Sequence, residues 1–158
     1  LLFISLGTGV GAGLILDEKL RHGCRFLYGE IGYYAPDVHS FSSYRQQGWL
    51  ESQLNIEALK NKFAFDLACP QARPEIYDHI SKILAPAISN IVNILDIETV
   101  VLGGVLIDTL DQKFIDYISE VVGKLVLNPV QIEKHTADEP GIIGAATLAI
   151  NQRLDEII

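Results

Sequence analysis

The chain has 158 residues, of which 49% are hydrophobic and 20% charged, and this composition predicts a soluble chain of about one domain. Its formal net charge of −8 and its 12 scattered Lys and Arg residues argue against a nucleic-acid-binding surface, which needs clustered basic side chains. The sequence has no methionine and begins at Leu1, so we expect it to be a piece of a longer polypeptide.

The cysteines and the apolar N-terminus predict neither a metal site nor a membrane span. Cys24 and Cys69 stand alone, without metal-ligand spacing, and we expect two free thiols in a reducing cytoplasm. The uncharged stretch from Leu1 to Leu16 holds four glycines and is short for a membrane helix, so we expect strands there. A cytoplasmic protein without a targeting segment is the expectation.

The first elements in chain order are strands. Leu1–Leu6 and Ala12–Leu16 are apolar runs on either side of a glycine-rich turn, which predicts two antiparallel strands. After a polar turn, a short third strand is expected to begin at Leu20. Residues 23–45 show no clear periodicity, and such a stretch inside a compact domain is usually functional or mobile.

Helical periodicity returns from about Gln46 to Phe63 and again over Pro74–Leu95, where Pro86 is expected to kink the helix. The later elements are expected to be a buried strand from Thr99 into a glycine pair, a helix over Asp108–Leu127, a strand over Val130–Lys134 and a helix over Gly141–Ile158. This order predicts an α/β domain with a mixed sheet covered by helices.

The stretch "ISLGTGVGAGLILD" (residues 4–17) places four glycines at every second position between the first two strands. One interpretation is a tight hairpin, because glycine reaches positive φ without cost. The other is an anion site, in which successive backbone N–H groups and the Thr8 hydroxyl face a phosphate. The stretch alone leaves both interpretations open.

Five motifs occur in one order along the chain: the glycine turn, "GEIGYY", "QGWLES", "VVLGG" and "PGIIGAATLA". Together they resemble the ROK family of sugar kinases and repressors, in the actin-like, hexokinase-like ATPase superfamily with its ribonuclease H-like fold. The resemblance covers essentially the whole chain. It implies that residues 1–158 are a single C-terminal lobe, an α/β unit with a mixed sheet flanked by helices, and that an N-terminal lobe and any DNA-binding domain precede it.

The resemblance implies a nucleotide site made of two glycine motifs. The opening turn is similar to the family's second phosphate-binding loop, which would place four residues beside the β- and γ-phosphates of ATP: Gly7, Thr8, Gly9 and Gly11. "LGG" is similar to the adenosine motif, in which Gly103 and Gly104 would leave room for the purine ring and ribose. A plain strand-to-helix turn is the alternative there, and for "GIIGAATLA" we expect close helix packing.

The resemblance also implies a sugar site. Where the family reads Gly-Glu-x-Gly-His, this chain keeps Glu30 but has Tyr33 in the place of the histidine. Glu51 matches the glutamate of the family's Gly-Cys-Leu-Glu motif, and Trp49 stands where the last cysteine would. Carboxylates accept hydrogen bonds from sugar hydroxyls, so Glu30, Tyr33 and Glu51 are the candidate monosaccharide ligands. Solvated loop glutamates are the alternative, and the change to Tyr33 predicts a shifted or weakened sugar preference.

We expect the family's structural zinc to be absent. A zinc site needs about four nitrogen or sulfur ligands, and the segment that should supply them offers His39 and no cysteine. Aromatic packing is expected to hold this segment instead, with stacking on a sugar ring as the alternative use of the same side chains: Tyr33, Tyr34, Phe41, Tyr44 and Trp49.

No residue elsewhere in the chain is assigned a catalytic role. Three histidines have no partner at catalytic spacing: His22, His79 and His135. Four acids recur along one predicted helix face and are expected to be solvated: Asp108, Asp111, Asp116 and Glu120.

Two functions are then open. In the family, the catalytic aspartate and the first phosphate loop lie in the N-terminal lobe, so this chain alone is expected to be inactive. The intact protein is expected to be a sugar-sensing transcriptional regulator, because the histidine and the cysteines are lost. An ATP-dependent sugar kinase is the alternative, because the glycine turn is intact. The expected partners are a monosaccharide, Mg-ATP in a kinase, a second copy in a homodimer, and DNA only through an N-terminal domain, with no membrane.

Overall fold

The computed structural model describes residues 1–40, 47–68 and 73–155, and its strands form a five-stranded mixed sheet. The strands lie in the order β3-β2-β1-β4-β5, and their bounds are β1 (Leu2–Leu6), β2 (Val10–Leu16), β3 (Lys19–Leu20), β4 (Thr99–Gly103) and β5 (Gln131–Lys134). β2 pairs antiparallel with β1 and β3, whereas β1, β4 and β5 run parallel. The predicted mixed sheet is confirmed.

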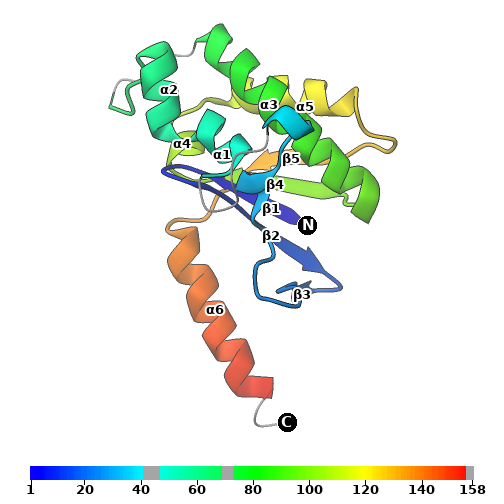
Figure 1. Cartoon of the computed structure of the whole chain (residues 1–158). Coiled ribbons are helices and arrows are strands. Elements are labelled where there is room, and N and C mark those ends of the chain that lie inside the picture. The colour runs from blue at the N-terminus through cyan, green and yellow to red at the C-terminus, as the bar shows by residue number, and fades with distance from the viewer. Residues whose placement is uncertain (41–46, 69–72, 156–158) are drawn as a thin grey trace.

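Four helices lie together on one side of this sheet (Figure 1): α1 (Trp49–Leu54), α2 (Ile56–Phe63), α3 (Pro74–Leu95) and α5 (Gln112–Gly123). α3 and α5 pack against each other. On β1, Leu2, Ile4 and Leu6 are buried in the hydrophobic core, whereas the residues between them are partly exposed. The two-residue period of a strand therefore directs one face of the sheet into the core.

Helix α3 has the predicted bounds. Pro74 stands in the first turn, where its missing N–H removes no helical hydrogen bond. The helix continues through Pro86 and ends at Leu95, and the next residue, Asp96, caps it with a left-handed φ of 51°. Ile80, Leu84 and Ile88 are fully buried, as the apolar stripe predicts.

Two stretches that we expected to be single helices differ from that prediction at a polar capping residue. The stretch from Gln46 to Phe63 breaks at Asn55, which is extended and whose Oδ1 accepts a hydrogen bond from the Ala58 N–H at 2.7 Å. The helix expected over Asp108–Leu127 is shorter than predicted, because Asp108 is the last residue of α4 (Val105–Asp108) and α5 spans only Gln112–Gly123. The Asp111 carboxylate accepts the Phe114 N–H at 3.3 Å and so begins α5. Asn and Asp are strong N-cap residues, and each begins a new helix here.

The segment expected to be irregular holds two short 3-10 helices, η1 (Ile31–Tyr33) and η2 (Val38–Ser40). Helix α6 (Pro140–Asp155) extends away from the rest of the fold (Figure 1), and its residues 141–150 are exposed. Its expected end at Ile158 lies outside the described residues. Among the helices described, none is long and apolar enough to cross a membrane.

Candidate functional site

The glycine turn and the "LGG" segment lie next to each other at one edge of the sheet. They follow the carboxyl ends of β1 and β4, which are parallel neighbours with Ser5 opposite Gly103. A Cβ added to Gly7 would lie 3.3 Å from Cγ1 of Val105, the first residue of α4. Because open α/β sheets bind ligands at the carboxyl ends of their strands, the two turns are positioned to contact one ligand.

The glycine turn keeps unpaired donors at its tip. The Gly7 N–H donates to the Gly9 carbonyl oxygen at 3.0 Å, and the Ile56 N–H donates to the Gly7 carbonyl oxygen, also at 3.0 Å. Within residues 1–40, 47–68 and 73–155, the amides of Thr8 and Gly9 donate to no other group. Gly11 pairs with Ser5 in the sheet. Of the predicted phosphate ligands, Thr8 and Gly9 thus offer the free N–H groups that an anion site needs.

Glu51 of α1 holds this turn from the side. Its Oε2 accepts a hydrogen bond from the Val10 N–H at 3.0 Å, and a Cβ on Gly9 would lie 3.0 Å from the same oxygen. The Glu51 side chain is half-buried. One oxygen of this predicted sugar ligand is therefore bound to the hairpin, while Oε1 accepts no hydrogen bond from the part of the chain that the structure describes.

Two glycines bring "GEIGYY" against β2 and "QGWLES" against "GEIGYY". Gly29 has a φ of +95°, and its carbonyl oxygen accepts the Ala12 N–H at 2.7 Å. A Cβ on Gly29 would lie 1.8 Å from the Ala12 carbonyl oxygen, and one on Gly48 would lie 2.2 Å from the Gly32 carbonyl oxygen. No side chain fits at either position. The glycines of these motifs are thus required where the segments meet.

The other two candidate sugar ligands lie on the surface beside this packing. Glu30 is exposed, and Tyr33 is 50% exposed. Glu30 borders a mainly apolar groove of about 360 Å³. The remaining lining residues come from β1, β2, α3 and the segment around Glu30: Leu2, Ala12, Tyr28, Gly29, Ile31, Tyr34, Ile91, Ile94 and Leu95. Both polar tips are therefore accessible to a ligand.

Two of the aromatic residues expected to hold this segment do pack. The Tyr34 hydroxyl accepts a hydrogen bond from Nδ2 of Asn90 on α3 at 3.2 Å, and Trp49 is half-buried against the core. The expectations for Phe41 and Tyr44 fall outside the described residues. No group of three or more His, Cys, Asp or Glu residues in the described ranges is arranged to hold a metal ion. The absence of zinc stays a prediction.

The glycine pair after β4 fits tightly against β1. Gly104 has a φ of +91°, and a Cβ there would lie 2.5 Å from the Leu6 carbonyl oxygen. A Cβ on Gly103 would lie 2.8 Å from the Phe3 ring and 3.2 Å from Cδ2 of His135. Packing explains both glycines, because protein atoms fill the space beside them. Their expected contact with adenosine stays a prediction.

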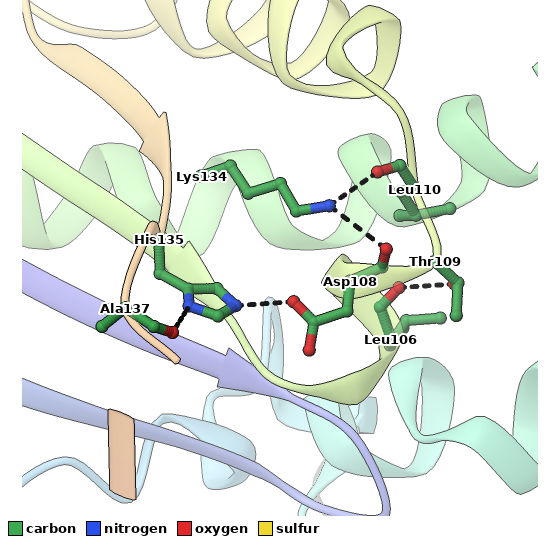
Figure 2. Close-up of polar contacts among 7 residues, drawn as sticks. All are labelled: Leu106, Asp108, Thr109, Leu110, Lys134, His135 and Ala137. Carbon is green, nitrogen blue, oxygen red and sulfur yellow. Dashed lines mark hydrogen bonds and ion pairs between the residues drawn. The ribbon is translucent and has the colours of Figure 1, made fainter. Parts of the chain in front are cut away.

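His135, which lies beside Gly103, belongs to a polar network that we did not predict, and Figure 2 shows this network. His135 Nε2 lies 2.6 Å from Asp108 Oδ1, and its Nδ1 lies 3.1 Å from the Ala137 carbonyl oxygen. Lys134 Nζ donates to the carbonyl oxygens of Asp108 at 3.2 Å and Leu110 at 3.0 Å. The expectations of a partnerless His135 and a merely solvated Asp108 are wrong. Their spacing in the sequence gave no signal, because the pairing of β4 with β5 brings them together.

Asp111 also has specific partners, contrary to expectation. Besides capping α5, it accepts a hydrogen bond from the Tyr77 hydroxyl at 2.7 Å. Burial, followed by this hydrogen bond, raises the pKa of Tyr77 to about 12. The same hydrogen bond is the main cause that lowers the pKa of Asp111. The pair ties α3 to the start of α5 and lies outside the candidate site.

His79 has structural contacts. Its Nδ1 lies 3.2 Å from Lys62 Nζ, and its Nε2 lies 3.3 Å from the Gln53 carbonyl oxygen. Burial, followed by the charge of Lys62, lowers the pKa of His79. A neutral ring that accepts from Lys62 and donates to Gln53 satisfies both contacts.

Comparison with known proteins gives relatives that are about twice as long as this chain. It is 28% identical over 169 residues to the N-acetylmannosamine kinase of Yersinia pestis, covering 94% of this chain and 56% of the kinase. It is 32% identical over 113 residues to an uncharacterised protein of Clostridium perfringens, covering 64% of this chain and 37% of that protein.

Solved structures with the same fold include kinases and a regulator. The ROK hexokinase of Thermus thermophilus matches with a TM-score of 0.73 at 19% identity, over 93% of this chain and 56% of the hexokinase. A ROK family transcriptional regulator homologous to the Escherichia coli MLC protein matches with a TM-score of 0.69 at 18% identity. The match covers 88% of this chain and 42% of the regulator. The Streptomyces griseus ROK glucokinase, in complex with glucose and AMPPNP, matches with a TM-score of 0.66 at 18% identity. The match covers 84% of this chain and 54% of the glucokinase.

The family model described as ROK family matches residues 1–152, which is nearly the whole chain. This chain is a member of the ROK family.

Proposed function

We propose that the chain is the sugar-binding and ATP-phosphate-binding lobe of a sugar kinase. The observation that carries this proposal is the turn after β1, where the amides of Thr8 and Gly9 have no partner in the described part of the chain. A turn without bulky side chains lets backbone N–H groups approach a polyphosphate closely. Its position beside Val105 at the start of α4 gives the rest of a nucleotide a second surface to contact.

The relatives support a kinase over the regulator that we expected from the loss of the histidine and cysteines. The similarity to the N-acetylmannosamine kinase of Yersinia pestis extends over 94% of this chain. The glucose in the structure of the Streptomyces griseus glucokinase supports a monosaccharide as the ligand class.

Phosphoryl transfer to a sugar hydroxyl needs a base near that hydroxyl, Mg²⁺ and a phosphate cradle. In this proposal, the present chain supplies the cradle and the hydroxyl ligands. The exposed Glu30 carboxylate accepts hydroxyl hydrogen bonds, as does Oε1 of Glu51, which has no partner among the described residues, and the Tyr33 hydroxyl donates one. The base belongs to the N-terminal lobe, so this lobe alone binds without turnover.

A sugar-sensing regulator is the second candidate function. Tyr33 stands where the family pattern has a histidine, and a ROK transcriptional regulator has the same fold with a TM-score of 0.69. In that case the lobe binds sugar and shifts a two-state equilibrium, while a domain outside this chain contacts DNA.

Calorimetric titration of the intact protein distinguishes the two functions. The protein is titrated with Mg-ATP and with a panel that includes glucose and N-acetylmannosamine, and sugar phosphate is assayed in the same samples. Nucleotide binding with product formation supports the kinase, whereas sugar binding without either supports the regulator. Gly9→Val should weaken nucleotide binding, because the new side chain meets Glu51, and Gly123→Val is the matched control at a position with open space.

Metal content and assembly are tested on the same samples. We propose a zinc-free homodimer, for which elemental analysis finds no stoichiometric zinc and light scattering gives twice the chain mass. One zinc per chain would contradict the proposed packing of the segment around Tyr33.

A further inference from the structure

We propose that His135 is a positioning residue for the nucleoside half of the nucleotide, because it fixes α4 and the Gly103–Gly104 turn against the end of β5. This inference rests on the proposed nucleotide binding. His135 belongs to none of the motifs of the sequence analysis, and its ring lies beside Gly103. Figure 2 shows its contacts with Asp108 and Ala137.

The ring of His135 is held at three points. Nε2 pairs with Asp108 Oδ1 at 2.6 Å, Nδ1 pairs with the Ala137 carbonyl oxygen at 3.1 Å, and Cδ2 lies against Gly103. The His135 side chain is 14% exposed, although its partner Asp108 is 50% exposed. A carboxylate oxygen only accepts hydrogen bonds, so Nε2 is the donor to Asp108. The result is a side-chain contact between the residue that follows β5 and the last residue of α4.

Lys134, the preceding residue, holds the same helix by its last turn. Its ammonium donates to the carbonyl oxygens of Asp108 and Leu110, which lie at and just beyond the end of α4. The last carbonyls of a helix have no intrahelical donor, so a lysine there satisfies them. Lys134 and His135 thus bind the backbone and the side chain of Asp108 together.

Helix α4 depends on such outside contacts because it spans only residues 105–108. A helix of one turn is not stable by itself. At its other end, Gly104 lies so close to Leu6 that the turn has no freedom on that side. Loss of the His135 ring therefore removes the side-chain link to Asp108 and the packing of the ring against Gly103. Helix α4 and the His135 side of this turn loosen, although Lys134 still binds the helix backbone.

Hydrogen exchange of the intact protein tests the contact itself. Three amides report on α4 and the turn after it, since they donate to Gly104, Leu106 and Ile107: Asp108, Thr109 and Leu110. In His135→Ala and Asp108→Ala these amides should exchange at least about tenfold faster than in the wild type, with unchanged exchange in β1 and α3. His79→Ala is the matched control, because that ring also makes two polar contacts, and its partners, Lys62 and Gln53, belong to neither α4 nor β5. Unchanged exchange in α4, or equal acceleration throughout the protein, would overturn the inference.

Ligand titration tests the nucleoside role. His135→Ala should weaken Mg-ATP binding about tenfold and leave the binding of Mg-tripolyphosphate and of sugar unchanged, because only the nucleoside half contacts this turn. His135→Gln keeps one donor for Asp108 and should restore part of the loss, which also keeps the test valid if the alanine variant folds poorly. Unchanged ATP affinity in His135→Ala would overturn this inference alone. A wild-type protein that binds no ATP would overturn the proposed function, and the nucleoside role with it.

Discussion

Gly48→Ala should destabilise the fold strongly, because a side chain at this position meets only backbone. The added Cβ would lie 2.2 Å from the Gly32 carbonyl oxygen and 2.6 Å from the Tyr33 Cα, whereas ordinary contact begins at 3.4 Å. The segments carrying "QGWLES" and "GEIGYY" must then separate by about 1 Å. Overpacking costs about 1–3 kcal/mol when side chains adjust, and we expect about 3 kcal/mol or more here because no side chain can yield.

Thermal unfolding followed by circular dichroism measures this loss. For a chain of this length, about 3 kcal/mol corresponds to a fall in Tm of roughly 6–12 °C. Gly11→Ala is the matched control, since its Cβ would meet nothing within 4 Å, and it should unfold at or slightly above the wild-type temperature. A Gly48→Ala protein that unfolds within about 2 °C of the wild type would refute the close packing of these segments.

Three further predictions concern individual side chains. Glu51→Ala removes the acceptor of the Val10 N–H and should lower the free energy of unfolding in urea by about 1–2 kcal/mol. Glu51→Gln keeps an acceptor and should keep most of that stability. Equal losses in the two variants would show that the charge of Glu51, and not this hydrogen bond, stabilises the turn. Because the folded pKa of Tyr77 is raised to about 12, its hydrogen bond to Asp111 contributes stability that is complete below about pH 10 and is lost toward pH 12. Tyr77→Phe should therefore be less stable than the wild type at pH 8, and the difference should shrink as the pH rises through this window; a constant difference would contradict it. Glu30→Gln in the intact protein should weaken sugar binding by about 1–3 kcal/mol, measured by calorimetry. Unchanged affinity would show that Glu30 does not contact the sugar.

Local pattern predicted much of the fold. The stripe over Pro74–Leu95 predicted α3 with its observed bounds, and the glycines between two apolar runs predicted the β1–β2 hairpin. The same approach failed at Asn55 and Asp111. Each lies within a stretch whose apolar spacing continues across it, and periodicity does not distinguish a polar residue on a helix surface from one that caps a new helix.

The site residues that lie in short sequence motifs were predictable. The contacts between segments that only the folded sheet brings together were not. The motifs located Glu51, but its hydrogen bond to Val10 depends on how α1 packs on the hairpin. They also located Gly103, but not the Phe3 and His135 rings that fill the space beside it. Parallel strands bring distant segments to one edge, and the contacts made there leave no fixed spacing in the sequence.

The most direct measurement is the amide NMR spectrum of the intact protein during titration with Mg-ATP. If the turn after β1 binds the phosphates, the Thr8 and Gly9 resonances shift in a saturable way, and Gly9→Val abolishes the shifts while Gly123→Val does not. Saturable ATP binding that leaves both amides unshifted, or no binding by a folded protein, would contradict the account and leave the glycine turn as a plain hairpin.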